Sequence, residues 1–105
     1  MTKILSIFRH AEAECNPRFS DHLRPLSLSG VADAGLMAEH LTGVVAPVDM
    51  VFCSDAERTL ETLRILNQTL SVSAEHIISD PNLYLASSTD LIARVEALSS
   101  EWQHV

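Results

Sequence analysis

The sequence has little positive charge and no long hydrophobic run. Among 105 residues there are 7 Lys and Arg against 14 Asp and Glu, a formal net charge of −7. Because proteins neutralise the phosphates of DNA or RNA with clustered Lys and Arg, this balance argues against a nucleic-acid partner. The few arginines are therefore expected to act individually.

Membrane and export segments are also lacking. The apolar stretch at residues 1–8 is too short for a signal peptide, and no later stretch approaches the length of a membrane span. There is no internal repeat. We expect a cytoplasmic protein with a single domain at residues 1–105.

Cysteines are scarce as well. Cys15 and Cys53 show neither disulfide-framework nor redox spacing, so reduced thiols are expected. At a strand end beside a helix, Cys53 either has a lowered thiol pKa or is buried and inert. The second interpretation is stronger, because the glycines of a cysteine-phosphatase loop are missing. Four histidines show no ligand spacing, so no metal and no cofactor are expected: His22, His40, His76 and His104.

An apolar run that ends in reactive side chains opens the chain. Residues 3–8 predict a strand buried on both faces of a parallel sheet, and Arg9 and His10 follow it directly. Sites in open α/β sheets lie at the carboxyl ends of strands. Imidazole can attack phosphorus, and a guanidinium offers donors to phosphoryl oxygens. An isolated histidine there would more often be a buried, hydrogen-bonded residue.

The rest of the pattern alternates helices with short strands. A long loop is expected at residues 11–26, strands at 49–53 and 76–79, and a turn at 80–86. A helix is predicted from a cap at Ser27 or Ser29 to about residue 41, closed by Gly43. A Ser54–Glu57 capping box should begin the next. The last helix, after Ser87 or Ser88, should bury four residues: Leu91, Ile92, Val95 and Leu98. These elements predict an α/β fold, a mostly parallel sheet flanked by helices.

The sequence resembles the histidine phosphatase (phosphoglycerate mutase-like) superfamily, and within it the small phosphohistidine phosphatases of the SixA type. Arg9-His10-Ala11 is similar to the family's Arg-His-Gly signature, with Ala in place of Gly. Three further segments match in order, at residues 21–30, 51–62 and 80–84. The resemblance spans nearly the whole chain and implies the family's fold with its C-terminal portion missing.

The resemblance also implies roles for individual residues. His10 would be the nucleophile that forms a phosphohistidine, and Arg9 and Arg58 would hold the phosphoryl group. Arg58 is predicted in the first turn of a helix, where a cation opposes the helix dipole unless an anion binds there. A surface ion pair of Arg58 with Glu57 or Glu61 is the alternative.

Two loop residues are further candidates for substrate binding. Asn16 stands six positions after His10, the spacing at which related mutases place an Asn on the phosphate, but the Asn16-Pro17 step equally fits a turn. Arg24 is able to reach a substrate, whereas Asp21 is expected to form an ion pair that anchors the loop.

Two departures from the family pattern limit the assignment. Leu85 stands where larger members carry a glutamate general acid, which favours phosphoramidates or good leaving groups as substrates. The family's second catalytic histidine follows a later apolar strand, and His104 precedes that position, so it receives no such role.

These features predict a phosphatase that dephosphorylates phosphohistidine on a signalling protein, or a small phosphoester. A non-catalytic phosphate- or phosphoprotein-binding module and an inactive fragment are the alternatives. Without the missing part, sheet edge and apolar helix faces should be exposed, so a homodimer is a further expectation.

Overall fold

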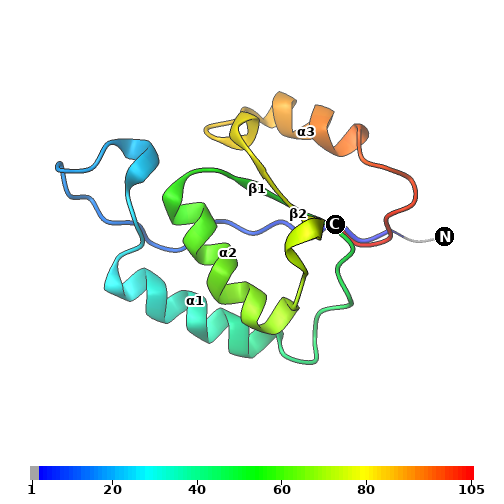
Figure 1. Cartoon of the computed structure of the whole chain (residues 1–105), viewed down its shortest axis with the longest axis horizontal. Helices are drawn as coiled ribbons and strands as arrows, with labels where there is room; N and C mark the ends of the chain where they lie inside the picture. Colours follow the sequence, from blue (N-terminus) through cyan, green and yellow to red (C-terminus); the bar gives the residue numbers. More distant parts are fainter. Residues whose placement is uncertain (1–2) are drawn as a thin grey trace.

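The computed structural model describes residues 3–105, and its elements alternate between helices and strands. Figure 1 shows α1 and α2 on one side of the strands and α3 on the other. The predicted α/β class is confirmed. In chain order the elements are η1 (Asp21–Leu23), α1 (Leu28–Leu41), β1 (Val51–Ser54), α2 (Glu57–Leu70), η2 (Ala74–His76), β2 (Ile77–Asp80), η3 (Pro81–Leu83) and α3 (Ser88–Glu96).

The regular sheet in the described part of the chain consists of β1 and β2, which run parallel. Val51 pairs with Ile77 and Ser54 with Asp80, and α2 provides the crossover that parallel neighbours require. Both strands lie within one or two residues of the predicted ranges 49–53 and 76–79.

The predicted first strand, residues 3–8, is wrong as a regular strand. Ile4 forms a single parallel bridge with His104, and residues 5–10 have no strand partner within residues 3–105. A strand requires a neighbour that accepts and donates its backbone hydrogen bonds, and the apolar pattern of the segment does not supply one.

α1 and α3 begin at residues whose side chains cap them. The Ser27 side chain accepts a hydrogen bond from Gly30 N, and Ser87 and Asp90 form a reciprocal capping box at the start of α3. Gly43 has φ 74°, the left-handed conformation expected after the end of α1.

The predicted Ser54–Glu57 capping box is wrong. Ser54 is the last residue of β1, and its Oγ accepts from Ala56 N at 3.2 Å. Ala56 is the N-cap residue of α2, and it has no side chain that accepts a hydrogen bond. The helix therefore begins without a side-chain cap, at Glu57.

The core lies between α1 and α2. Ala38, Leu41 and Leu66 are buried together, and partly buried apolar residues pack around them. By contrast, the predicted inward face of α3 is largely exposed. Leu91 is 46%, Ile92 59% and Val95 41% exposed, because no further segment packs over them in the described structure.

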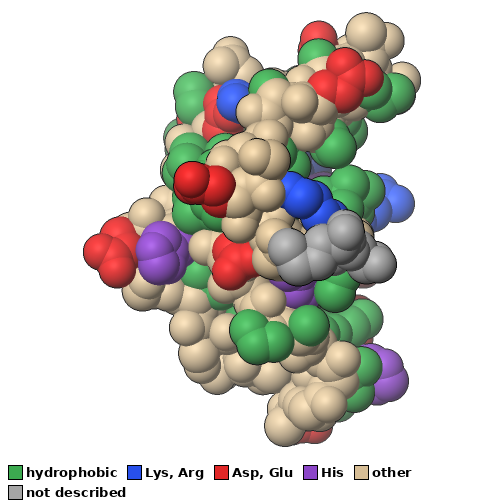
Figure 2. All heavy atoms as spheres, turned by 90° about the vertical axis from the view of Figure 1, so that its right-hand side faces the viewer, with side chains coloured by type: hydrophobic (Ala, Val, Ile, Leu, Met, Phe, Trp, Pro, Cys, Tyr) green, Lys and Arg blue, Asp and Glu red, His purple; other side chains and the backbone are tan. Residues whose placement is uncertain are grey.

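Many large apolar side chains are therefore exposed at the surface. On the face drawn in Figure 2, they appear above and below its middle, with few basic groups among them. No helix within residues 3–105 has the length and apolar character needed to cross a membrane.

The start of α1 is pressed against the segment that follows His10. Ser27 N donates to Glu12 O at 2.9 Å, and a Cβ added to Gly30 would lie 2.1 Å from the same oxygen. An antiparallel bridge between Ala13 and Leu26 continues this contact. Only a residue without a side chain allows the helix to approach so closely.

Candidate functional site

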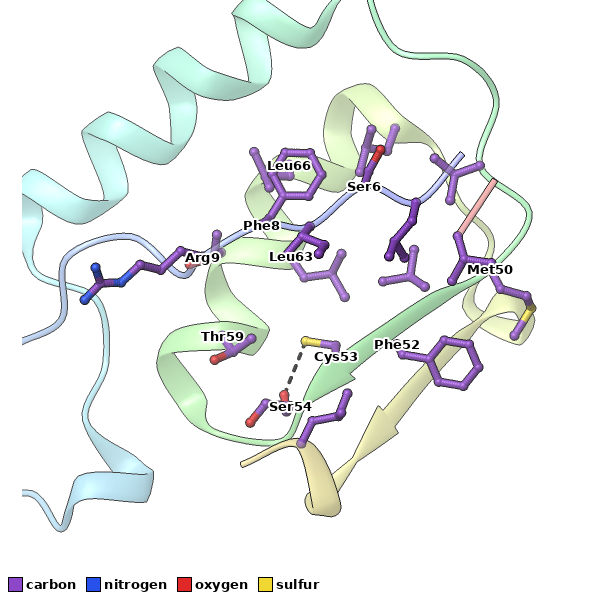
Figure 3. A pocket seen from close by; sticks show the side chains of 18 of the residues that line it. Ser6, Phe8, Arg9, Met50, Phe52, Cys53, Ser54, Thr59, Leu63 and Leu66 are labelled. Carbon is purple, nitrogen blue, oxygen red and sulfur yellow. Dashed lines mark hydrogen bonds between the residues drawn. The ribbon is translucent and has the colours of Figure 1, made fainter. Parts of the chain in front are cut away.

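A hollow of about 340 Å³ separates the N-terminal segment from β1. Figure 3 shows the N-terminal segment along one border, β1 along the other and α2 side chains between them. Most of its lining is apolar, but four polar residues lie along it toward the carboxyl ends of both segments: Arg9, His10, Ser54 and Thr59. Chemistry would therefore take place at this end.

His10 is half-buried and has a defined ring orientation. Its Nδ1 lies 2.7 Å from the carbonyl oxygen of Ala11. A carbonyl only accepts, so Nδ1 carries the proton and, in the neutral ring, Nε2 is the free basic nitrogen. That is the arrangement a histidine nucleophile requires.

Thr62 connects this segment to α2, a role that sequence reasoning missed. Ala11 N donates to Thr62 Oγ1 at 3.1 Å, and this hydroxyl donates to Arg58 O at 2.8 Å. Thr62 is 6% exposed. The sequence did contain a signal for this role: Thr62 is a polar residue on the apolar face of the predicted helix, one turn after Arg58. The hydroxyl fixes the backbone after His10 against the turn of α2 that carries Arg58.

Arg58 lies in the first turn of α2, as predicted, but its partner is neither Glu57 nor Glu61. Its Nη1 donates to Asp21 O at 2.7 Å and its Nη2 to the Asp21 carboxylate at 3.2 Å. The side chain is 7% exposed, and its Nε has no hydrogen-bond partner in the described structure. A buried donor without an acceptor is costly, so this nitrogen is an unsatisfied polar group at the start of α2.

The N-terminus of α2 offers further donors. The backbone N–H groups of Glu57 and Arg58 have no acceptor among the described residues. Such groups, together with the helix dipole, favour an anion.

Asp21 gathers three groups around one carboxylate. Besides Arg58 it accepts from Arg24 Nε at 3.2 Å and from the Tyr84 hydroxyl. The Tyr84 hydrogen bond lowers the pKa of Asp21 most, and the hydrogen bond and charge of Arg58 lower it further, although desolvation opposes the shift. The same hydrogen bond raises the pKa of Tyr84. The predicted Asp21–Arg24 ion pair is confirmed, at 3.1 Å, and it anchors the loop to α2 through Arg58.

The other predicted site residues are placed differently. Arg9 is exposed, forms no ion pair within residues 3–105, and points away from the apolar lining in Figure 3. Arg24 Nη1 donates to Glu14 O at 3.0 Å. Asn16 Oδ1 accepts from Arg18 N at 2.9 Å, the hydrogen bond of a turn. The structure thus brings Arg24 and Arg58 together at Asp21 and leaves Arg9 free.

His104 is a structural residue. It is 3% exposed, its Nδ1 donates to the carbonyls of Ala46 and Pro47, and its Nε2 accepts from the Ser6 hydroxyl at 2.7 Å. His22 is engaged by Asp55, whose carboxylate lies 2.8 Å from the His22 Nε2. Neither histidine bonds to His10.

Burial decides between the two interpretations of Cys53, and exposure describes the position of Leu85. Cys53 is 5% exposed, and desolvation raises the pKa of its thiol to about 11, so it is the inert residue. Leu85, at the position of the absent acid, is 75% exposed with φ 52°. It has no group that donates a proton.

The fold is similar to solved phosphohistidine phosphatase structures. A SixA protein of Nakamurella multipartitia, provisionally assigned as a phosphohistidine phosphatase, matches 98% of this chain at 32% identity with a TM-score of 0.79. An equally provisional SixA protein of Agrobacterium tumefaciens matches 96% at 25% identity with a TM-score of 0.82. The protein histidine phosphatase SixA complexed with tungstate matches 93% at 25% identity with a TM-score of 0.74.

In each comparison the relative is longer. The chain spans 56%, 63% and 60% of those three structures. An uncharacterised chloroplastic protein of Arabidopsis thaliana is 32% identical over 94 residues, 86% of this chain and 42% of its own length. An uncharacterised Mycobacterium tuberculosis protein is 40% identical over 55 residues, 52% of this chain and 35% of its own length.

The sequence model of the histidine phosphatase superfamily (branch 1) matches residues 5–84. That range contains the segment around His10, the start of α2 with Arg58, and the Asp21 loop. Together with the structural similarity over nearly the whole chain, it shows that this chain belongs to the histidine phosphatase superfamily.

Proposed function

We propose that this chain carries the phosphate-binding half of a phosphatase that works through a phosphohistidine intermediate on His10. The carrying observation is the hydrogen bond from His10 Nδ1 to the Ala11 carbonyl, which leaves Nε2 free in the neutral ring. The Nε2 lone pair would form a bond to phosphorus while the bond to the leaving group breaks, and that group departs with its electron pair. Water then hydrolyses the phosphohistidine.

Positive charge for the transferred group comes from two segments. Arg9 is unpaired among residues 3–105 and adjoins His10, whereas Arg58 lies in the first turn of α2, where the N–H groups of Glu57 and Arg58 have no acceptor among the described residues. Phosphoryl transfer depends mainly on positioning and on such charge. The tungstate complex of the related SixA protein supports the proposal, because tungstate is a tetrahedral oxyanion like phosphate.

The substrate we propose is phosphohistidine on a cytoplasmic signalling protein, with a small phosphoester as the alternative. The exposed Leu85 supplies no proton. When phosphohistidine, a phosphoramidate, gives up its phosphoryl group, the leaving group is the imidazole of the substrate histidine. Imidazole is a better leaving group than an alkoxide, so the reaction depends less on a general acid. Arg24 and Asn16 stay candidates for contact with the substrate.

The test is phosphoryl trapping on the intact chain. The protein is mixed with radiolabelled phosphoramidate, and the reaction is quenched. The intact mass then shows whether a phosphoryl group was added, and loss of the label in acid identifies it as phosphohistidine. We expect label on the wild type and none on His10→Ala. His40→Ala is the matched control, because His40 is exposed on α1. Label that persists in His10→Ala would refute the assignment.

A non-catalytic phosphate-binding module is the second candidate. The observation in its favour is that His22 and His104 are both engaged away from His10. Calorimetry with tungstate separates the two functions. A binding module predicts saturable binding that is lost in Arg58→Gln and no trapped label, whereas the phosphatase predicts both binding and label.

A further inference from the structure

The polar end of the hollow contains two hydroxyl groups to which the proposed function gives no role. Ser54 is the last residue of β1, and Thr59 lies in the first turn of α2. Both are partly buried and line the hollow, as do Arg9 and His10. Figure 3 shows Ser54 and Thr59 at the same end of the hollow, where β1 leads into α2.

The Thr59 hydroxyl lacks the partner that a threonine in a helix usually finds. Such a hydroxyl commonly donates to the carbonyl three or four positions earlier. Thr62 does so, because its Oγ1 donates to Arg58 O at 2.8 Å. Thr59 is too near the start of α2 to have such a carbonyl within the helix, and its hydroxyl forms no hydrogen bond within residues 3–105. The hydroxyl therefore keeps its donor for water or for a ligand.

The Ser54 hydroxyl is held in place but uses only its acceptor. Its Oγ accepts from Ala56 N at 3.2 Å. A hydroxyl also donates one hydrogen, and that of Ser54 has no acceptor within residues 3–105. This end of the hollow thus has a second hydroxyl whose donor is unused.

Donors outnumber acceptors where β1 leads into α2. Besides the two hydroxyls, the N–H groups of Glu57 and Arg58 have no acceptor among the described residues. The Nε of Arg58 has none either, although the side chain is only 7% exposed. Unpaired polar groups are rare inside native proteins and are commonly explained by a bound water or ion. An oxyanion suits such a set of donors, because its oxygens only accept hydrogen bonds.

The geometry of α2 places Thr59 close to the segment that carries His10. Thr62 Oγ1 accepts from Ala11 N at 3.1 Å, so the residue after His10 contacts α2 at position 62. Side chains three positions apart on a helix are neighbours, with about 5–6 Å between their Cβ atoms. Thr59 therefore lies one helical turn from the contact between Ala11 and α2.

We propose that Thr59 is a phosphoryl-binding residue, whose hydroxyl donates a hydrogen bond to an oxygen of the phosphoryl group held at His10. This inference rests on the phosphate site of the proposed function. It concerns binding, so it applies to the phosphatase and to the binding module alike. Most of the hollow is lined by apolar side chains, and a hydrogen bond to an anion is stronger where little water competes.

The experiment measures tungstate binding to the intact chain by calorimetry, with urea unfolding of each variant alongside. Thr59→Val keeps the shape and removes the hydroxyl, whereas Thr59→Ser keeps the hydroxyl and removes the methyl group. We expect Thr59→Val to weaken tungstate binding about tenfold, the effect of one hydrogen bond to a charged group, and Thr59→Ser to recover most of that loss. The urea midpoint of Thr59→Val should equal that of the wild type, because the hydroxyl has no protein partner. Thr89→Val, at an exposed position of α3, is the matched control and should bind as the wild type does.

Four results would overturn the inference. Unchanged binding by Thr59→Val would remove Thr59 from the site and leave the proposed function standing. Equal weakening by Thr59→Val and Thr59→Ser would show that the shape of the side chain matters and the hydroxyl does not. A lower urea midpoint of Thr59→Val without tungstate would assign the hydroxyl to a contact within the protein. Absence of tungstate binding by the wild type would remove the phosphate site itself, and with it the proposed function as well.

Discussion

The Arg58 guanidinium is clamped by Asp21, which accepts from Nη1 through its main-chain carbonyl at 2.7 Å and from Nη2 through its carboxylate at 3.2 Å. One residue of the loop thus holds both terminal nitrogens of an arginine on α2. The same carboxylate pairs with Arg24 and accepts from Tyr84. The loop therefore sets the position of two cations at the candidate site.

The first prediction concerns acid stability. The folded pKa of Asp21 lies below the ordinary 3.8, so its contribution is fully present above about pH 4 and is lost as pH falls toward the folded pKa. We expect the melting temperature of Asp21→Asn, measured by circular dichroism from pH 2 to 6, to depend less on pH in this range. The difference between Asp21→Asn and the wild type should be largest at pH 6. Parallel curves at all pH values would show that the carboxylate is not coupled to folding.

The second prediction concerns the buried hydroxyl of Thr62. Thr62→Val keeps the shape but leaves Ala11 N without its acceptor, so urea unfolding should show a loss of about 1–3 kcal/mol. Thr89→Val, at an exposed position in the first turn of α3, is the control and should change stability by less than about 0.5 kcal/mol. Tungstate affinity should also fall in Thr62→Val, because the backbone after His10 loses its attachment to α2. An unchanged affinity would argue against this positioning role.

The third prediction compares two glycines of α1. Gly30→Ala places a Cβ 2.1 Å from Glu12 O and should cost about 3 kcal/mol or more. Gly35→Ala meets no atom within 4 Å and should stabilise the protein by about 0.5–1 kcal/mol, the usual difference between Gly and Ala in a helix. Thermal unfolding of both variants measures the contrast. Similar values for the two would mean that α1 does not press against Glu12.

The fourth prediction concerns thiol reactivity. Cys15 is exposed, whereas Cys53 is buried with a pKa of about 11. At pH 8 a thiol-reactive dye should label one cysteine per native chain quickly and the second only after unfolding. Cys15→Ser should remove the fast reaction. Fast labelling of two thiols in the native protein would contradict the burial of Cys53.

Local signals in the sequence anticipated much of the helical framework. Ser27 and Ser87 cap their helices through hydrogen bonds to residues three positions on, and Gly43 adopts the positive φ that its type permits. Ser54 followed the same pattern but ends β1 instead, because pairing with Asp80 in β2 holds its backbone extended. Capping patterns are therefore informative only where no strand partner competes for the same residue.

For the candidate site as well, the sequence indicated some residues and only the structure showed their contacts. Residue types at a strand end pointed to Arg9 and His10, and the family resemblance added Arg58 at a helix start. They did not show that Asp21 clamps Arg58 or that Thr62 ties Ala11 to α2. Those contacts join residues 37 and 51 positions apart.

The sequence by itself determined where α1 and α3 begin and which residues are chemically able to handle phosphate, because these depend on neighbours within a few positions or on side-chain chemistry. The alternation of apolar segments and helices also indicated the parallel β1–α2–β2 unit. Only the tertiary structure decided that residues 7–10 form no backbone hydrogen bond within residues 3–105, that the apolar side of α3 is exposed there, and that Arg58 turns to the Asp21 loop. The reason is physical: backbone pairing and burial are properties of two surfaces in contact, and a pattern in one segment specifies only one of them.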